Sequence, residues 1–180
     1  MILVLITAIL IALTIGVEAV FLRIQWKHQQ LTKWFGENAF KVHSIVTQGL
    51  WILASAGILW LTFQPYPRFH EVRWLSILGW ILTAAGMIVA TAGYIKLGLD
   101  RSLGINFFKD DVPIETGGIY KYLSHPEEHG FWVMMIGFAL GTASWYNLIF
   151  ALEFILLMIP HQKIENLPLQ ESEDSAPRTS

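Results

Sequence analysis

The architecture of this chain follows from residues 131–159, which read FWVMMIGFALGTASWYNLIFALEFILLMI. As a single helix, this stretch of about 29 residues would be roughly 44 Å long at about 1.5 Å per residue. Such a helix is too long for one crossing of a hydrocarbon core that is about 30 Å thick. The Gly-Thr-Ala-Ser sequence at residues 141–144 is a turn signal in the middle of the stretch. We therefore predict a hairpin of two short membrane helices.

Three further apolar stretches precede this hairpin, at residues 2–22, 42–63 and 74–95. Each is long enough for a membrane helix, which needs about 20 apolar residues. The first has no basic segment before it and no clear small-residue cleavage site after it, so we interpret it as a retained span rather than a signal peptide. The predicted fold class is all-α: a polytopic membrane helix bundle of about five transmembrane helices, with the last two forming the hairpin.

The composition agrees with a membrane protein. Hydrophobic residues make up 54% of the chain and charged residues only 14%, with a mean hydropathy of +0.49, whereas soluble domains carry about 25% charged residues. The net charge of −2 gives no electrostatic footprint for nucleic acid. The absence of cysteine excludes disulfides, thiolate metal ligands and thiol nucleophiles. We expect one membrane domain over residues 1–170 and a polar tail over residues 171–180.

Lys and Arg are unevenly distributed among the predicted loops. The loops after the first and third spans hold four each, whereas the loop after the second span holds only Arg68 and Arg73. In membrane proteins, the cytoplasmic loops carry the excess of positive charge. The sequence therefore predicts an N-terminus outside the cell, with the third loop, the C-terminus and any site formed there in the cytoplasm.

A polar stretch, TGGIYKYLSHP, leads into the hairpin at residues 116–126. Polar groups beside a bilayer are costly and usually mark a site. Pro126 suits the first turn of a helix, where its missing N–H would be unpaired, and this makes His125 the expected N-cap. Glu127 and Glu128 suit a helix N-terminus through the helix dipole. Helix capping alone, including a capping box in which Glu127 reaches back to the backbone, is therefore an alternative to a functional role.

Other aromatic and acidic residues are further candidates. Tyr120 and Tyr122 alternate, so in an extended loop they would face different sides; one could wall a pocket, or both could be interface aromatics. Glu165 follows the last apolar segment and is either solvated or an anion that faces a bound cation. Glu18 and Glu153 interrupt apolar runs, and each faces either the bundle or an interface.

A metal site is a second interpretation of the same region. His125, Glu128 and His129 match the H-x-x-E-H pattern of inverted zinc metalloproteases. His161 and Glu165 add an i, i+4 pair on one helix face. The zinc pattern places both histidines well inside a helix, whereas the proline after His125 starts a helix between them. Metal coordination therefore stays an alternative to an organic ligand.

The residues of this region resemble the integral-membrane methyltransferases. The match consists of Thr-Gly-Gly-Ile-Tyr-Lys-Tyr at residues 116–122, the His125-Pro126 step and Glu165, with Leu103-Gly104 upstream. That group includes isoprenylcysteine carboxyl methyltransferases, phospholipid N-methyltransferases and small-thiol S-methyltransferases. The resemblance implies a transferase that uses S-adenosylmethionine to methylate a lipophilic acceptor, namely an amino-phospholipid, an isoprenylcysteine or a small thiol.

The resemblance also implies roles for individual residues. The implied cofactor-binding residues are Gly117, Gly118, Tyr120, His125, Pro126 and Glu165, and the implied catalytic residues are Glu128 and His125. The chemistry is compatible, because glycines allow close backbone approach and a helix N-terminus binds a carboxylate. An aromatic ring can also meet the sulfonium of the cofactor.

Three positions depart from the pattern of these relatives. Ser124 stands where relatives usually have Arg, Glu128 where they have Tyr, and Asn166 where they have a second Glu. Arg binds a carboxylate through two hydrogen bonds and Ser does not, so an isoprenylcysteine acceptor is less favoured. Glu128 instead favours an amine, which it would attract or deprotonate. The alternatives are a metal- or haem-binding relative that uses His125, Glu128, His129 and His161, and a non-catalytic relative.

Overall fold

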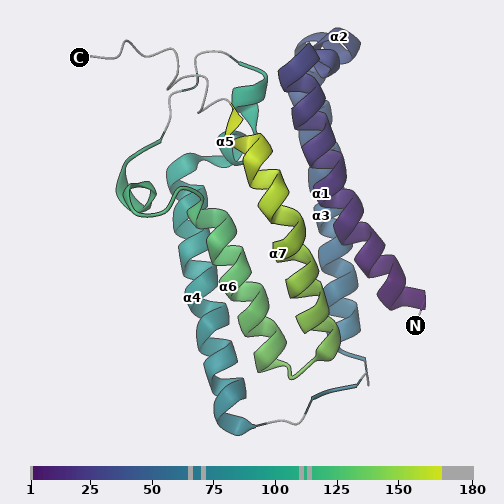
Figure 1. The fold of residues 1–180 in the computed structure, drawn as a ribbon, viewed down its shortest axis with the longest axis vertical. Coiled ribbons are helices and arrows are strands. Elements are labelled where there is room, and N and C mark those ends of the chain that lie inside the picture. The colour runs from purple at the N-terminus through teal and green to yellow at the C-terminus, as the bar shows by residue number, and fades with distance from the viewer. Residues whose placement is uncertain (1, 65–66, 70–71, 110–111, 113–114, 168–180) are drawn as a thin grey trace.

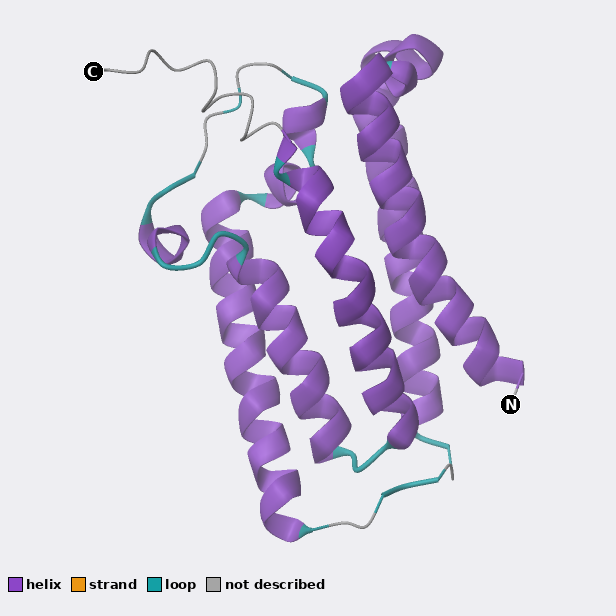
Figure 2. Ribbon diagram, in the orientation of Figure 1, coloured by secondary structure: helices purple, strands orange, loops and turns teal. Residues whose placement is uncertain are grey.

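The structure is a computed structural model that describes residues 2–64, 67–69, 72–109, 112 and 115–167. Its five long helices are α1 (Ile2–His28), α3 (Ala39–Thr62), α4 (Arg73–Leu97), α6 (Pro126–Gly141) and α7 (Trp145–Glu165) (Figures 1 and 2). Shorter helices are α2 (Gln30–Phe35) and α5 (Leu99–Ser102), and 3₁₀ turns η1, η2 and η3 lie at Gly36–Asn38, Ile105–Phe107 and Gly118–Lys121. The predicted all-α class is confirmed. The predicted tail, residues 171–180, lies outside the described residues.

The predicted hairpin is formed by α6 and α7. Four segments of the described chain are long and apolar enough to cross a membrane, namely α1, α2 together with α3, α4 and α7. The sixteen residues of α6 make a helix about 24 Å long, which completes the bundle. Between α6 and α7, Ala143 has a φ of +49°. The Ser144 hydroxyl accepts a hydrogen bond from the Asn147 backbone N–H at 3.3 Å and caps α7.

The long helices pack in two groups that α7 joins (Figure 1). α4 and α6 form the closest pair, α1 packs on α3, and α7 contacts α6, α1 and α3. Glycines on both α4 and α6, including Gly86 and Gly130, bring those two backbones into direct contact. The main apolar core is formed by residues of α1, α3 and α7, namely Ile11, Ile15, Ala54, Leu61, Phe150, Phe154 and Met158.

The up-and-down course of the helices sorts their connections to two ends of the bundle. One end carries α2, α5, the start of α6 and the end of α7, whereas the other carries the α3–α4 connection and the α6–α7 turn (Figure 1). At the first end, His43 Nε2 lies 3.1 Å from the Leu103 carbonyl oxygen, and Gln25 Nε2 donates to the Phe107 carbonyl at 3.3 Å. These contacts tie the segment between α4 and α6 to α1 and α3.

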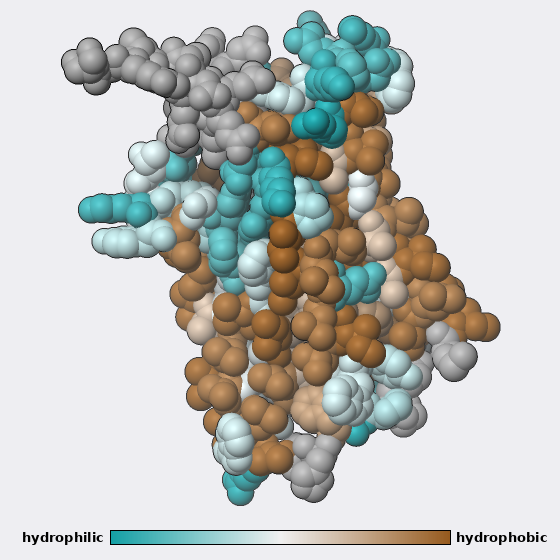
Figure 3. Space-filling view, viewed as in Figure 1, coloured by the Kyte–Doolittle hydropathy of each residue, from teal (hydrophilic) through white to brown (hydrophobic). Residues whose placement is uncertain are grey.

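Apolar side chains cover the outside of the bundle between its two ends (Figure 3). Ile52 on α3, Ile95 on α4 and Leu156 on α7 are among the exposed ones, with Ile95 79% exposed. An apolar surface of this extent would be unfavourable in water, and it suits contact with lipid chains. The bundle is therefore that of an integral membrane protein.

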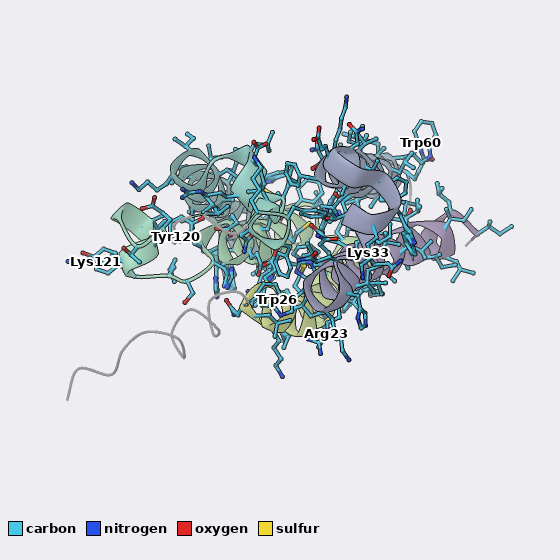
Figure 4. All side chains as sticks on the ribbon, turned by 90° about the horizontal axis from the view of Figure 1, so that it is seen from above. Arg23, Trp26, Lys33, Trp60, Tyr120 and Lys121 are labelled. Atoms are coloured by element: carbon cyan, nitrogen blue, oxygen red, sulfur yellow. The ribbon has the colours of Figure 1, made fainter. Side chains whose placement is uncertain are left out.

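Between α4 and α6, the described residues include the short helix α5 and the 3₁₀ turns η2 and η3. One expectation is wrong: Tyr120 lies in the 3₁₀ turn η3 and not in an extended loop. Gly118 opens this turn with a φ of +61°. Figure 4, which views the bundle from this end, shows Lys121 at the outer edge of the segment and Tyr120 nearer to the bundle. Tyr122 is exposed, whereas Tyr120 is partly buried.

Candidate functional site

A cavity of about 540 Å³ lies between α1, α3, α4, α6 and α7. Most of its lining is apolar, with Ile11, Trp51, Phe131, Met134 and Phe154 among the contributing side chains. One end is different, because it is lined by the acidic and basic side chains Glu18, Glu127, Glu128, His161 and Glu165. We call these five residues together with His125 the polar cluster. The cavity is therefore mostly apolar, with a cluster of acidic side chains at one end.

His125 and Glu165 lie next to each other although 40 residues separate them. His125 immediately precedes α6 and Glu165 is the last residue of α7, so the antiparallel hairpin brings them to the same end. His125 Nδ1 lies 3.8 Å from Glu165 Oε2, and His125 Nε2 lies 3.0 Å from Asn166 Oδ1. His125 is the N-cap residue by position, but its side chain makes no capping hydrogen bond. The hairpin thus turns the imidazole toward α7.

Glu127 binds Tyr120 and does not cap the helix. The Tyr120 hydroxyl donates to Glu127 Oε2 at 2.6 Å and lies 3.4 Å from the Gly93 carbonyl oxygen. Burial, followed by the hydrogen bond to Glu127, raises the pKa of Tyr120, so the phenol keeps its proton. The capping box is therefore wrong, because Glu127 points to η3 and not back to the start of its own helix. This contact docks η3 against α4 and α6.

Glu128 belongs to the polar cluster, whereas His129 does not. Glu128 is 7% exposed, and its carboxylate accepts a hydrogen bond from Gln162 Nε2. His129 Nδ1 contacts the His125 carbonyl oxygen at 2.6 Å, and its ring lies 4.9 Å from that of Trp132. Among the described residues, His129 is not part of the group whose donor atoms converge with those of His125 and Glu128.

Donor atoms of His125, Glu128 and Glu165 lie within 4.8 Å of one another. This spacing could hold a metal ion, but the Glu128 carboxylate is already hydrogen-bonded to Gln162. The predicted metal set also required His129 and His161, but these two do not converge on His125 and Glu128. The cluster consequently fits an organic cation better than a tetrahedral metal ion.

His161 is the most buried member of the polar cluster, at 2% exposed. Its Nδ1 lies 3.8 Å from Glu165 Oε1, and its Nε2 lies 3.7 Å from Glu18 Oε2. Glu18 comes from α1 and accepts a hydrogen bond from Trp51 Nε1 at 3.4 Å. From the sequence, Glu18 is expected to face either the bundle or an interface, and no partner for it is predicted. The available signal was an ionisable side chain inside an apolar helix.

The predicted glycine pair lies apart from this cavity. Gly117 donates its backbone N–H to Glu115 Oε1 at 2.9 Å, and Lys96 Nζ lies 3.3 Å from the same oxygen. Gly117, Gly118 and Tyr120 are absent from the described cavity lining. The glycines therefore form a turn that Glu115 anchors to α4, and only Tyr120 reaches the polar cluster, through Glu127.

Glu115 should hold this turn in a pH-dependent way. The Gly117 N–H first, and then Lys96, lower the pKa of the Glu115 carboxyl below its usual 4.5. Because the pKa is lower in the folded state, the ionised Glu115 carboxylate stabilises the turn at pH values above its unfolded-state pKa. This stabilisation is lost as the pH falls through the folded-state pKa. We expect Glu115→Gln to increase cleavage between α5 and α6 by a protease active at neutral pH, and wild-type protein to resist. Equal cleavage of both proteins would contradict the anchor.

The three residues that depart from the methyltransferase pattern have different surroundings. Ser124 is exposed, so it offers no replacement for an Arg inside the cavity. Asn166 holds His125 through its side chain, and Glu128 lies in the polar cluster. No Lys or Arg is among the described residues that line the cavity. The net charge of the lining is negative when its carboxylates are ionised, so the site suits a cationic ligand rather than an acidic one.

The fold and site can be compared with known proteins. The family model for phospholipid methyltransferases matches residues 74–172, which include α4, α6 and α7. Phosphatidylethanolamine N-methyltransferase A of Dictyostelium discoideum is 28% identical over 148 residues, which cover 76% of this chain and 65% of that protein. The chain thus spans just under two thirds of that relative. No solved structure matches. Since the family model covers more than half of the chain, the protein belongs to the phospholipid methyltransferase family.

Proposed function

We propose that the protein is an S-adenosylmethionine-dependent methyltransferase that methylates the amine of a membrane phospholipid. The proposal depends on one observation: the cavity inside the membrane bundle is mostly apolar but is also lined by a cluster of acidic side chains. An amino-phospholipid has the same two parts, a cationic headgroup and apolar chains. We also propose that the described helices form a single domain, because residues of α1, α3, α4, α6 and α7 line the same cavity.

The methyl donor is proposed to bind at the polar cluster. When bound, S-adenosylmethionine supplies a methyl group activated by a positively charged sulfonium. His125 and Glu165 would hold the charged end of the donor, and Tyr120 would keep Glu127 in place. Pro126 opens α6, whose backbone N–H groups suit the donor carboxylate. Binding both reactants in one geometry favours an in-line displacement.

The cavity favours an amine acceptor over the alternatives. Carboxylates of the polar cluster attract an ammonium group and repel the carboxylate of an isoprenylcysteine. No Lys or Arg among the described lining residues compensates for that repulsion. Glu128 is proposed to attract the acceptor amine, because it is a buried carboxylate that lines the cavity. A small thiol lacks the charge that would make use of these carboxylates.

The proposed orientation places the active site in the cytoplasm. The end of the bundle that carries the polar cluster also carries the two connections rich in Lys and Arg. The α3–α4 connection at the other end contains Arg68 and begins α4 with Arg73. The positive-inside rule therefore favours a cytoplasmic site, where a water-soluble methyl donor is accessible.

The first test measures donor binding. The purified protein in detergent should unfold at a higher temperature with S-adenosylmethionine, and also with its demethylated product. A ligand at 100 times its Kd stabilises the native state by about 2.7 kcal/mol. The metal content of the same preparation should be well below one ion per chain. Stabilisation by neither ligand would contradict the proposal, and a stoichiometric metal or haem would favour the alternative function.

The second test identifies the acceptor. Donor with a labelled methyl group should transfer the label to phosphatidylethanolamine in mixed micelles. Phosphatidylcholine is a matched control, because its quaternary nitrogen has no lone pair to accept a methyl group. An isoprenylcysteine and a small apolar thiol complete the comparison. Label in either of these, without label in phosphatidylethanolamine, would contradict an amine acceptor. The proposal that the protein is a methyltransferase would then still hold.

A further inference from the structure

Carboxylates and imidazoles alternate along a line that runs from the cavity to the end of the bundle. Glu18 Oε2 lies 3.7 Å from His161 Nε2, and His161 Nδ1 lies 3.8 Å from Glu165 Oε1. Glu165 Oε2 lies 3.8 Å from His125 Nδ1, which is 3.9 Å from Glu127 Oε1. The line begins on α1, crosses the end of α7 and reaches the start of α6.

His161 is the central member of this line. Neither of its ring nitrogens has a hydrogen-bond partner in the described part of the structure, although the side chain is fully enclosed. A buried polar group without a partner costs free energy, so packing alone does not account for this imidazole. Each nitrogen faces a carboxylate slightly beyond hydrogen-bond distance, a gap that a small rotation or one bridging water closes. Histidine can take a proton on one nitrogen and release one from the other.

Amine methylation requires a path of this kind. An ammonium group has no lone pair, so it must lose a proton before its nitrogen attacks the methyl carbon. The N–C bond then forms as the C–S bond of the donor breaks, and the electron pair of the broken bond stays on sulfur. The methylated nitrogen carries the positive charge. Each transfer therefore releases one proton inside a cavity whose lining is mostly apolar.

We propose that Glu18 is the base that removes this proton, and that His161, Glu165 and His125 conduct it to the end of the bundle. This inference rests on the proposed methylation of an amine. Glu18 lines the cavity itself and can therefore reach the acceptor. It lies on α1, before the region 74–172 that the family model matches. The N-terminal part of the chain would thus supply a catalytic group.

Other titratable groups surround the line. They are His43 of α3, Tyr94 of α4, Glu127 and Glu128 of α6, and Tyr120 of η3. Among these, Glu128 is the competing base, but its carboxylate is held by Gln162. Within the described part of the chain, Glu18 has only the long hydrogen bond from Trp51 and an imidazole that can take its proton onward. This difference assigns the attraction of the amine to Glu128 and the removal of the proton to Glu18.

The test uses Glu18→Gln, which keeps the shape of the side chain and removes the base. We expect methyl transfer to phosphatidylethanolamine at neutral pH to fall by about 100-fold, the lower range for a lost general base. Thermal stabilisation by the donor should remain. Since alkaline solution removes the proton from the amine, the variant's rate should rise about tenfold per pH unit below the amine pKa. The wild-type rate should reach a plateau at lower pH.

Glu153→Gln is the matched control, because Glu153 is the other glutamate inside an apolar helix and is absent from the described cavity lining. It should keep the wild-type rate and pH profile. Glu18→Asp should recover part of the lost rate, and His161→Gln should reproduce the loss and the altered pH dependence. If Glu18→Gln no longer folds, His161→Gln decides the question.

Two outcomes overturn different claims. An active wild-type enzyme together with a Glu18→Gln variant of the same rate and pH profile overturns the proton path and leaves the proposed function intact. A wild-type protein that binds no donor and transfers no methyl group overturns the proposed function, and the proton path with it.

Discussion

Replacing Gly86 by Ala is expected to lower the thermal unfolding temperature of the detergent-solubilised protein by about 10 °C, the equivalent of roughly 3 kcal/mol. A Cβ atom at Gly86 would meet the Met134 backbone N and the Gly130 carbonyl oxygen, closer than real Cβ contacts come. Both neighbours are backbone atoms of α6, so no side-chain rotation can make room. The two helices would have to separate.

The contact repeats along the α4–α6 pair, which is why one methyl group has a large effect. A Cβ on Gly130 would meet the Ala90 backbone N, and a Cβ on Gly93 would lie 2.8 Å from the Glu127 backbone N. Glu127 is also the partner of Tyr120. Separation of α4 from α6 would therefore displace the start of α6, so we expect Gly86→Ala to weaken donor binding as well as stability.

Gly16→Ala and Gly49→Ala are the controls for this experiment. Both glycines lie inside helices, and a Cβ on either would meet no atom within 4 Å. Ala is favoured over Gly in a helix interior by up to about 1 kcal/mol, so these variants should be as stable as wild type or slightly more stable. If Gly86→Ala unfolds at the same temperature as Gly16→Ala, α4 and α6 do not pack through their glycines.

The membrane spans could be predicted because hydropathy reports the part of each helix that meets lipid. The span expected at residues 74–95 becomes α4, Arg73–Leu97, and the hairpin turn falls at the expected Gly-Thr-Ala-Ser sequence. α1 continues to His28, beyond the expected end at residue 22. Gln25 is polar and yet buried, because its amide donates to the Thr32 hydroxyl at 2.8 Å. Hydropathy alone misses such a partner.

The candidate site could be predicted only in part. The nearness of His125 and Glu165 follows from an antiparallel hairpin, whose two outer ends must meet. The positions of Glu18 and His161 depend on how α1 is rotated against α7. The helical spacing of Thr7, Thr14, Glu18 and Gln25, which are all buried, marks the inner face of α1, but it does not identify the partner helix. The site roles given to Gly117 and Gly118 rest on resemblance alone; the Gly117 N–H binds Glu115, and neither glycine is in the described cavity lining.

Glu165→Gln is expected to weaken donor binding about 100-fold, or about 2.8 kcal/mol, with little change in the fold. Glu165 faces both His125 and His161 at 3.8 Å. Gln has nearly the same shape but no charge, so the apolar packing around the end of α7 should remain. The lost free energy then reports the attraction between this carboxylate and a bound cation. Titration calorimetry with the purified variant measures the change in Kd.

Lys163→Gln is the control, because it also changes one charge in the last turn of α7 but at an exposed position. It should bind the donor as wild type does. Unchanged binding by Glu165→Gln as well would place the donor elsewhere and contradict the role of the polar cluster.

Comparing two ligands shows which charge Glu165 faces. S-adenosylmethionine carries a sulfonium and an ammonium, whereas its demethylated product keeps only the ammonium. Equal losses of affinity for both ligands in Glu165→Gln would mean that Glu165 faces the ammonium. A larger loss for the donor would mean that it faces the sulfonium, since a Coulomb interaction falls with distance from the missing charge. In the second case, Glu165 would also favour binding of the donor over binding of the product, whose thioether is uncharged.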